Sequence, residues 1–247
     1  MAAGFTSPPR FLWPKEFPPL SPEQQVISDD WMRHWHEVSP RRYGAMVHFN
    51  HTYPVQYAPA AAGCRTLEIG AGLGEHLEYE PLDRQEYHCV ELRHNMAEAI
   101  TERFPGVILT VADCQTELPY PDSHFDRVIA LHVLEHLPNL PRAIDECHRV
   151  LKPGGKFVVV IPCDPGLVYG LARKISSERM FRKRYSMSFD WLIDREHINS
   201  PGEITGQLGR EFSPVHRRFW PLAVPITSLN LCMGMILVKT GSMRSRD

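Results

Sequence analysis

Residues 66–74 read Thr-Leu-Glu-Ile-Gly-Ala-Gly-Leu-Gly, a short apolar run that ends in three glycines at every second position. Glycine tolerates a left-handed backbone and lets the main chain approach a ligand closely. A strand that enters such a loop and then a helix is how doubly wound α/β domains bind nucleotide-like ligands at the carboxyl edge of the sheet. The stretch predicts a strand and a ligand loop, although G-x-G-x-G also occurs in turns that bind nothing.

The following sequence alternates strand and helix patterns. Strands are predicted at 87–92, 107–112, 125–132 and 157–161, with a helix at 141–150 before the last of them. This alternation predicts right-handed βαβ units and a parallel sheet. Glu91 lies 21 residues after Gly70, near the end of the second strand. An acid at that spacing is placed to accept hydrogen bonds from a ribose.

These segments together resemble the Rossmann-like methyltransferases that depend on S-adenosylmethionine. The matching segments lie within about residues 64–161 and are 67–74, Glu91, 112–113, 125–128, 134–136 and 151–155. The resemblance implies a doubly wound α/β fold with a mostly parallel, seven-stranded sheet and helices on both faces. It also implies an N-terminal lid and S-adenosylhomocysteine as a product. The long connection between Ile161 and Ser200 separately predicts a helical insertion after the fifth strand.

The resemblance assigns cofactor roles to individual residues. Glu68 would hold the amino group, Glu91 would accept from both ribose hydroxyls, and Asp113 would accept from the adenine amino group. The glycines would let the backbone approach the methionine part, and an apolar side chain would pack on the adenine. The full implied set is Glu68, Gly70, Gly72, Gly74, Glu91, Met96, Asp113, Cys114 and His132.

A dinucleotide-dependent oxidoreductase is the competing interpretation of the loop. Its fingerprint requires the third glycine one residue later than Gly74. A pyrophosphate also prefers a helix N-terminus without nearby carboxylates, whereas Glu68 and Glu75 flank this loop. Carboxylates at strand ends suit a sulfonium cation better.

Four segments are expected along the chain. Residues 1–60 would form an N-terminal lid, 61–161 the cofactor-binding core, 162–199 a helical acceptor cap, and 200–247 the rest of the core with a helix and the last two strands. Within residues 173–184 the cap contains one acid, Glu178, against six basic residues: Arg173, Lys174, Arg179, Arg182, Lys183 and Arg184. Such a segment would recognise an anionic acceptor, attach to an anionic membrane surface, or form a solvated face.

The acceptor residues are expected in the lid and the cap. They are His48, Asn50, His51, Tyr53 and Arg182, with core packing as the alternative for Tyr53. His197, just before a capping box at Ser200 and Glu203, is the first candidate for a general base, with Glu196 or Asp194 orienting it. His132 and His136 are the next candidates, and a structural role is the alternative for all three.

Composition narrows the class of protein. The 247 residues carry a net charge of −2, which gives no case for nucleic acid as a partner. Six scattered cysteines predict neither disulfides nor a zinc site, and the spacing of the histidines predicts no metal. Met1 to Pro19 does not resemble a signal peptide, and prolines interrupt the uncharged stretch 219–238. We therefore expect a cytoplasmic protein without a membrane span.

The sequence predicts methyl transfer from S-adenosylmethionine to a hydroxyl of a small molecule, sugar-like or a secondary metabolite. In-line displacement would be assisted by a histidine base. Transfer to an amine, which needs no base once neutral, is the alternative within the class. A non-catalytic cofactor-binding protein and the oxidoreductase are the alternatives outside it.

Overall fold

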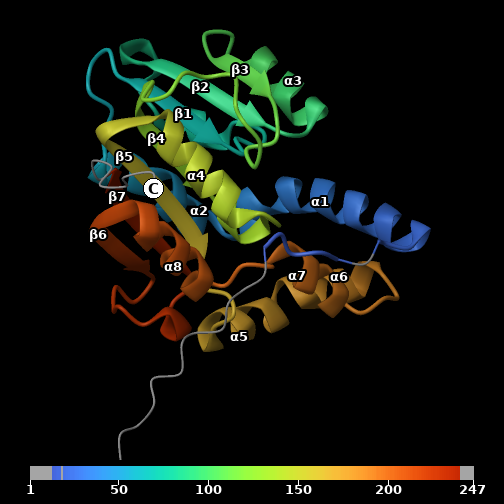
Figure 1. Cartoon of the computed structure of the whole chain (residues 1–247). Helices are drawn as coiled ribbons and strands as arrows, with labels where there is room; N and C mark the ends of the chain where they lie inside the picture. Colours follow the sequence, from blue (N-terminus) through green and yellow to red (C-terminus); the bar gives the residue numbers. More distant parts are fainter. Residues whose placement is uncertain (1–12, 18, 240–247) are drawn as a thin grey trace, which may run out of the picture.

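The computed structural model describes residues 13–17 and 19–239. These residues form one seven-stranded sheet flanked by helices, in the strand order β3-β2-β1-β4-β5-β7-β6 (Figure 1). The strands are β1 (Arg65–Ile69), β2 (Glu86–Glu91), β3 (Ile108–Val111), β4 (Phe125–Leu131), β5 (Leu151–Pro162), β6 (Phe212–Trp220) and β7 (Cys232–Lys239). The predicted doubly wound α/β class is confirmed.

The direction of the strands fixes where a ligand site can form. The first five strands are parallel, whereas β7 runs antiparallel to both β5 and β6. The carboxyl ends of β1 to β5 therefore meet at one edge of the sheet. The chain reverses its winding between β1 and β4, and the crevice beside such a switch point is where these sheets bind ligands.

Both faces of the sheet are covered. Phe49 and Tyr53 of α2 (Gly44–Tyr57) pack on Ile129, Val158 and Ile236. α3 (His94–Arg103) lies on the same face, over Cys89. On the opposite face, α4 (Leu140–Val150) and α8 (Pro201–Glu211) pack on a second apolar cluster that includes Val128 and Val159. Strands buried on both faces are rich in β-branched residues, as β5 is.

The segment ahead of β1, which is predicted to form a lid, is helical. It contains α1 (Pro22–Arg42) and α2, and α2 lies on the sheet. α1 packs instead on the insertion, where Trp31 contacts Phe181 and Phe189. The division into four segments remains a prediction, and its parts before residue 13 and after 239 lie outside the described residues.

The insertion after β5 is helical, as expected, but forms three helices. They are α5 (Leu167–Ile175), α6 (Ser177–Arg184) and α7 (Asp190–Glu196), and Figure 1 shows α6 and α7 beside α1. The predicted capping box is present, because Ser200 Oγ accepts from Glu203 N and the Glu203 carboxylate accepts from Ser200 N. All six cysteines are buried thiols. Among the described helices, none has the length and apolar character that crossing a bilayer requires.

Candidate active site

The loop after β1 is shaped by its glycines. Gly70, Gly72 and Gly74 have φ angles of 63°, 59° and 77°, in the left-handed region that favours glycine. A Cβ on Gly70 would also lie 2.5 Å from Cγ2 of Val133, so that position excludes larger residues for two reasons. The loop therefore presents bare backbone at the carboxyl edge of the sheet.

Glu91 connects the end of β2 to this loop. Its Oε2 accepts a hydrogen bond from Gly72 N at 2.9 Å, and its Oε1 accepts from Arg93 N at 2.9 Å. The side chain is buried, with 6% of its surface exposed. These bonds hold the carboxylate beside the glycine loop, and each oxygen keeps a lone pair for a further donor.

Glu68 lies beneath the loop at the end of β1. It is 3% exposed and accepts a hydrogen bond from the Tyr87 hydroxyl at 2.8 Å. Burial raises the pKa of this carboxyl, and the charge of His76 and the bond from Tyr87 lower it only in part. A cationic group above the loop would stabilise the ionised form.

The third acid follows β3. Asp113 Oδ1 accepts from the backbone N–H of Gln115 at 2.9 Å, which fixes the turn after the strand. Cys114 and Met96 are both buried, the first in the large cluster beneath α4 and the second on the inner side of α3. Five of the residues assigned to the cofactor thus belong to the ends of β1 to β3 and to α3: Glu68, Glu91, Met96, Asp113 and Cys114.

His132 follows β4 in a strained conformation. Its φ angle is 53°, which non-glycine residues adopt rarely and mostly at functional sites. Its Nδ1 donates to Glu135 Oε1 at 3.1 Å, whereas its Nε2 is buried without a partner. Burial alone would raise the pKa of Glu135, but the bond from His132 and the nearby charges of His136 and His197 lower it.

His197 has an aspartate partner, although not one of those that the sequence suggested. Its Nδ1 donates to Oδ2 of Asp164 at 2.8 Å. Asp164 is 5% exposed, lies two residues after the end of β5, and also accepts from Arg173 Nη1 at 2.6 Å. The expected partners, Glu196 and Asp194, are therefore wrong.

His136, the third histidine candidate, lies beside the other two. Its ring centroid is 5.5 Å from that of His197. Its Nδ1 bonds the main-chain carbonyl of Glu196, and the Glu196 carboxylate lies 3.5 Å from the same nitrogen. Glu196 thus supports His136 rather than His197.

Two residues of α2 bring unpaired polar atoms toward this edge. Oδ1 of Asn50 and Nδ1 of His51 are both buried without a hydrogen-bond partner. The ring of His51 stacks on His76 and Tyr79, with centroids 5.6 and 5.1 Å apart. Burial and the charges of His76 and His132 lower the pKa of His51 to about 3, although Glu75 opposes them.

The other expected acceptor residues have different surroundings. Tyr53 is 1% exposed inside the core, and its hydroxyl bonds His216 Nδ1 at 2.9 Å. His48 is exposed on α2, near Tyr79. Arg182 is 57% exposed on α6 and pairs with Glu178 on the same helix. We retain Asn50 and His51 as acceptor candidates and place Tyr53 in the core.

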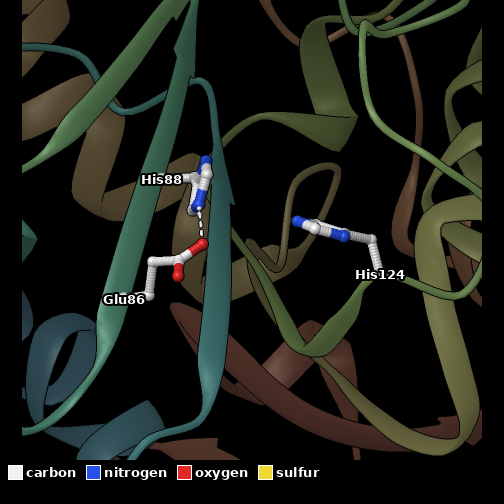
Figure 2. A group of neighbouring side chains, drawn as sticks. All are labelled: Glu86, His88 and His124. Atoms are coloured by element: carbon white, nitrogen blue, oxygen red, sulfur yellow. Dashed lines mark hydrogen bonds and ion pairs between the residues drawn. The ribbon is translucent and has the colours of Figure 1, made fainter.

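Among the residues that the structure describes, two groups of three side chains have donor atoms suited to a metal, and the sequence spacing indicated neither. Glu135, His136 and His197 form one, at the carboxyl edge, with donor atoms within 4.8 Å of one another. The other is Glu86, His88 and His124, at the opposite edge, where His88 Nε2 bonds Glu86 Oε1 at 2.8 Å (Figure 2). Arg65 Nε lies 3.4 Å from that same oxygen and competes for it.

Known methyltransferases are similar in sequence to the part of the chain that forms this edge. The family profile described as a methyltransferase domain matches residues 67–159. A sterol 4-C-methyltransferase from Caenorhabditis elegans is 30% identical over 148 residues, or 54% of this chain and 43% of the relative. A 27-O-demethylrifamycin SV methyltransferase from Amycolatopsis mediterranei is 32% identical over 120 residues, or 44% of each chain. The chain thus spans less than half the length of either relative.

Solved structures share the fold. A SAM-dependent methyltransferase from Corynebacterium glutamicum superposes with a TM-score of 0.58, at 15% identity, over 87% of this chain and 100% of that one. The matched profile ends before Asp164, His197 and the insertion. The residues that would meet an acceptor therefore lie mostly outside the region that the profile describes.

Proposed function

Because residues 67–159 match a profile described as a methyltransferase domain, we propose that this protein binds S-adenosylmethionine and methylates a hydroxyl of a small molecule, sugar-like or a secondary metabolite. The cofactor supplies a methyl carbon that its sulfonium already activates for in-line displacement. The protein then has to bind and orient both partners and accept the hydroxyl proton. Alignment alone contributes roughly 7–11 kcal/mol in well-ordered systems.

The residues at the carboxyl edge fit this cofactor. Carboxylates of Glu68, Glu91 and Asp113 end three adjacent strands, which suits a ligand with an ammonium group, a ribose and an adenine amino group. The loop beside them has no side chain at Gly70 and Gly72, whose positive φ angles turn the backbone at the same edge. We assign Glu91 to the ribose, Asp113 to the adenine and Glu68, directly or through water, to the amino group.

Unpaired atoms on the β4 side support an acceptor there. Nε2 of His132, Oε2 of Glu135 and Oδ1 of Asn50 are buried and have no partner among the described residues. Buried polar atoms are nearly always hydrogen-bonded in folded proteins. A polar acceptor between β4, α2 and the insertion would satisfy them.

The hydrogen bond between His197 and Asp164 is the observation that favours a hydroxyl, rather than an amine, as the methyl acceptor. An aspartate on Nδ1 fixes the ring and leaves Nε2 as the basic nitrogen, the arrangement that general bases use. Nε2 of His197 has no hydrogen bond to any described residue. An amine acceptor that arrives neutral would need no such base. The names of the two relatives refer to a carbon and to an oxygen, so they do not decide the atom.

The test combines product analysis with one histidine variant. The full chain is incubated with isotope-labelled S-adenosylmethionine and a panel of sugars, phenols and other hydroxylated metabolites. We expect a methylated product whose methyl resonance is that of an ether. His197→Ala should lower kcat by about 10²- to 10⁴-fold and leave the affinity for S-adenosylhomocysteine unchanged.

His94→Ala is the matched control, because His94 lies on the surface with 78% of its side chain exposed. It should change neither rate nor affinity. A methyl group on nitrogen or carbon, or a full rate with His197→Ala, would contradict the hydroxyl assignment. Binding of S-adenosylhomocysteine without transfer to any acceptor would favour a non-catalytic protein, and binding of NADH alone would exclude the cofactor.

A further inference from the structure

The loop between β6 and β7 exposes six consecutive apolar residues, 221–226, which read Pro-Leu-Ala-Val-Pro-Ile. The exposed fractions of Leu222, Val224 and Ile226 are 56%, 37% and 49%. Single exposed apolar residues are ordinary, whereas a contiguous group of them marks a contact surface. This group needs an explanation that the methyltransferase domain does not provide.

Helix α5 exposes a matching row. Leu167, Leu171 and Ile175 follow one another at four-residue spacing and therefore lie on one face of the helix. Their exposed fractions are 72%, 61% and 64%. The other side of the same helix carries Tyr169 and Arg173, which contact His197 and Asp164. α5 thus separates the candidate active site from the exposed row.

The loop and the helix adjoin each other. A Cβ on Gly166, which precedes α5, would lie 3.3 Å from Cα of Ser228 and 3.4 Å from the carbonyl oxygen of Thr227. Figure 1 shows α5 next to the orange-red turn that follows the loop. We call the following set the apolar face: Leu167, Leu171, Ile175, Leu222, Val224 and Ile226.

The loop is held in its exposed conformation. The side chain of Asn230 is fully buried and accepts from Leu222 N at 2.9 Å. Its amide nitrogen donates to the carbonyls of Val224 and Ile226, both at 2.9 Å. The buried Asn230 side chain thus pairs backbone N–H and carbonyl groups of the loop. The apolar side chains of the loop can therefore face outward while these backbone groups keep their hydrogen bonds.

Cations gather at one end of the apolar face. Beyond Ile175 the surface is hollowed, and the hollow is lined by Arg42, Ile175, Ser176, Arg179, Met180 and Lys183. Within the part of the chain that the structure describes, Lys174, Arg179 and Lys183 make no ion pair. Like charges four residues apart, as in Arg179 and Lys183, repel each other unless an anion lies between them.

We propose that the apolar face and its cations bind the surface of a membrane that contains anionic phospholipids. Apolar side chains that enter the headgroup boundary, together with basic residues that contact phosphates, are how monotopic proteins attach. A second copy of this chain is a poorer occupant, because a two-fold contact across this face would bring the same cations together. The proposal does not depend on which atom is methylated.

The test is flotation of the full chain with vesicles. One set contains phosphatidylcholine alone, and the other contains phosphatidylcholine mixed with phosphatidylglycerol. We expect the protein to float with the anionic vesicles only, and less at high salt. Leu222→Ser combined with Ile226→Ser should weaken binding by at least about tenfold. Arg179→Gln with Lys183→Gln should weaken it about fivefold for each cation removed.

Matched controls exist for both pairs. Val215→Ser removes an apolar side chain that is 61% exposed on β6, outside the apolar face. Arg84→Gln with Lys156→Gln removes two exposed cations near the opposite edge of the sheet. Both controls should bind as the native chain does, and thermal unfolding of every variant establishes that it is folded.

Three results would overturn the proposal. In the first, the native chain binds neither kind of vesicle. In the second, both variant pairs bind the anionic vesicles as strongly as the native chain does. In the third, sedimentation would show a dimer that the loop variant dissolves, with no vesicle binding. That outcome would assign the apolar face to a contact between copies of the chain.

Discussion

The ring of Tyr53 lies on the backbone of Gly234, so that a Cβ on this glycine would stand 2.7 Å from three of the ring carbons. Through this contact α2 reaches β7, and the residues expected to form a lid become one layer of the core. Tyr53 cannot give way, because it is 1% exposed and its hydroxyl is bonded to His216.

Gly234→Ala should therefore destabilise the protein. An added methyl group in a filled site costs about 1–3 kcal/mol. Urea unfolding would measure the loss. Gly209→Ala is the control, because nothing lies within 4 Å of its Cβ position in α8. Gly209→Ala should raise the free energy of unfolding by about 0.5–1 kcal/mol. Equal stability of Gly234→Ala and the native chain would show that α2 does not hold this position.

Local patterns predicted several features of the backbone well. Three glycines with positive φ, an acid at the end of β2 and the capping box at Ser200 all follow from short stretches of sequence. The packing of α2 could not be predicted in this way, because its apolar residues form no single stripe and only contact with the sheet determines which side is buried. Asp164, which lies 33 residues from His197 in the sequence, was not among the predicted partners of that histidine.

The sequence position of Asp164 could have suggested its role. Asp164 lies two residues after the end of β5, and acids at the ends of parallel strands meet at one edge of the sheet, as Glu91 and Asp113 do. The sequence could not show that α7 ends beside it, because that depends on how the insertion folds over the sheet. The contact between Glu135 and His132 could not be predicted for a similar reason, because it depends on the left-handed backbone conformation of His132.

Glu91→Ala should weaken binding of S-adenosylhomocysteine. The change removes the acceptor proposed for the ribose and also frees Gly72 N, so the loss should be about 2–4 kcal/mol. Isothermal titration calorimetry would measure it. Glu86→Ala, at the exposed start of the same strand, is the matched control and should bind normally. An affinity within twofold of native for Glu91→Ala would refute the ribose role.

Asp164→Asn should lower turnover. The amide keeps the shape but removes the charge that fixes the His197 ring, so we expect a kcat lower by about 10²-fold or more. Turnover rates, with S-adenosylhomocysteine affinity measured in parallel, would separate this effect from a loss of cofactor binding.

Asp194→Asn is the comparison for that variant, since Asp194 is exposed on α7 and does not contact His197. It should leave the turnover rate unchanged. If Asp194→Asn were the slower variant, the hydrogen bond between His197 and Asp164 would have no part in turnover.

The stability of the protein should fall below pH 6.5 because of His51. The folded state lowers the pKa of this imidazole from 6.5 to about 3, chiefly by burial. The unfolded chain then binds a proton that the folded protein does not. The stabilising contribution is therefore complete above the unfolded pKa and is lost as the pH falls from about 6.5 toward 3. The loss should approach about 1.4 kcal/mol for each pH unit.

His51→Gln should flatten this dependence, because glutamine does not titrate. Urea unfolding at several pH values between 7.5 and 5 would give the free energies, each compared with the native chain at the same pH. His94→Gln removes an exposed histidine and should leave the native slope intact. Should His51→Gln lose stability with acid as steeply as the native chain, the ring of His51 would have to be accessible to protons in the folded state. Its stacking between His76 and Tyr79 would then not shield it from water.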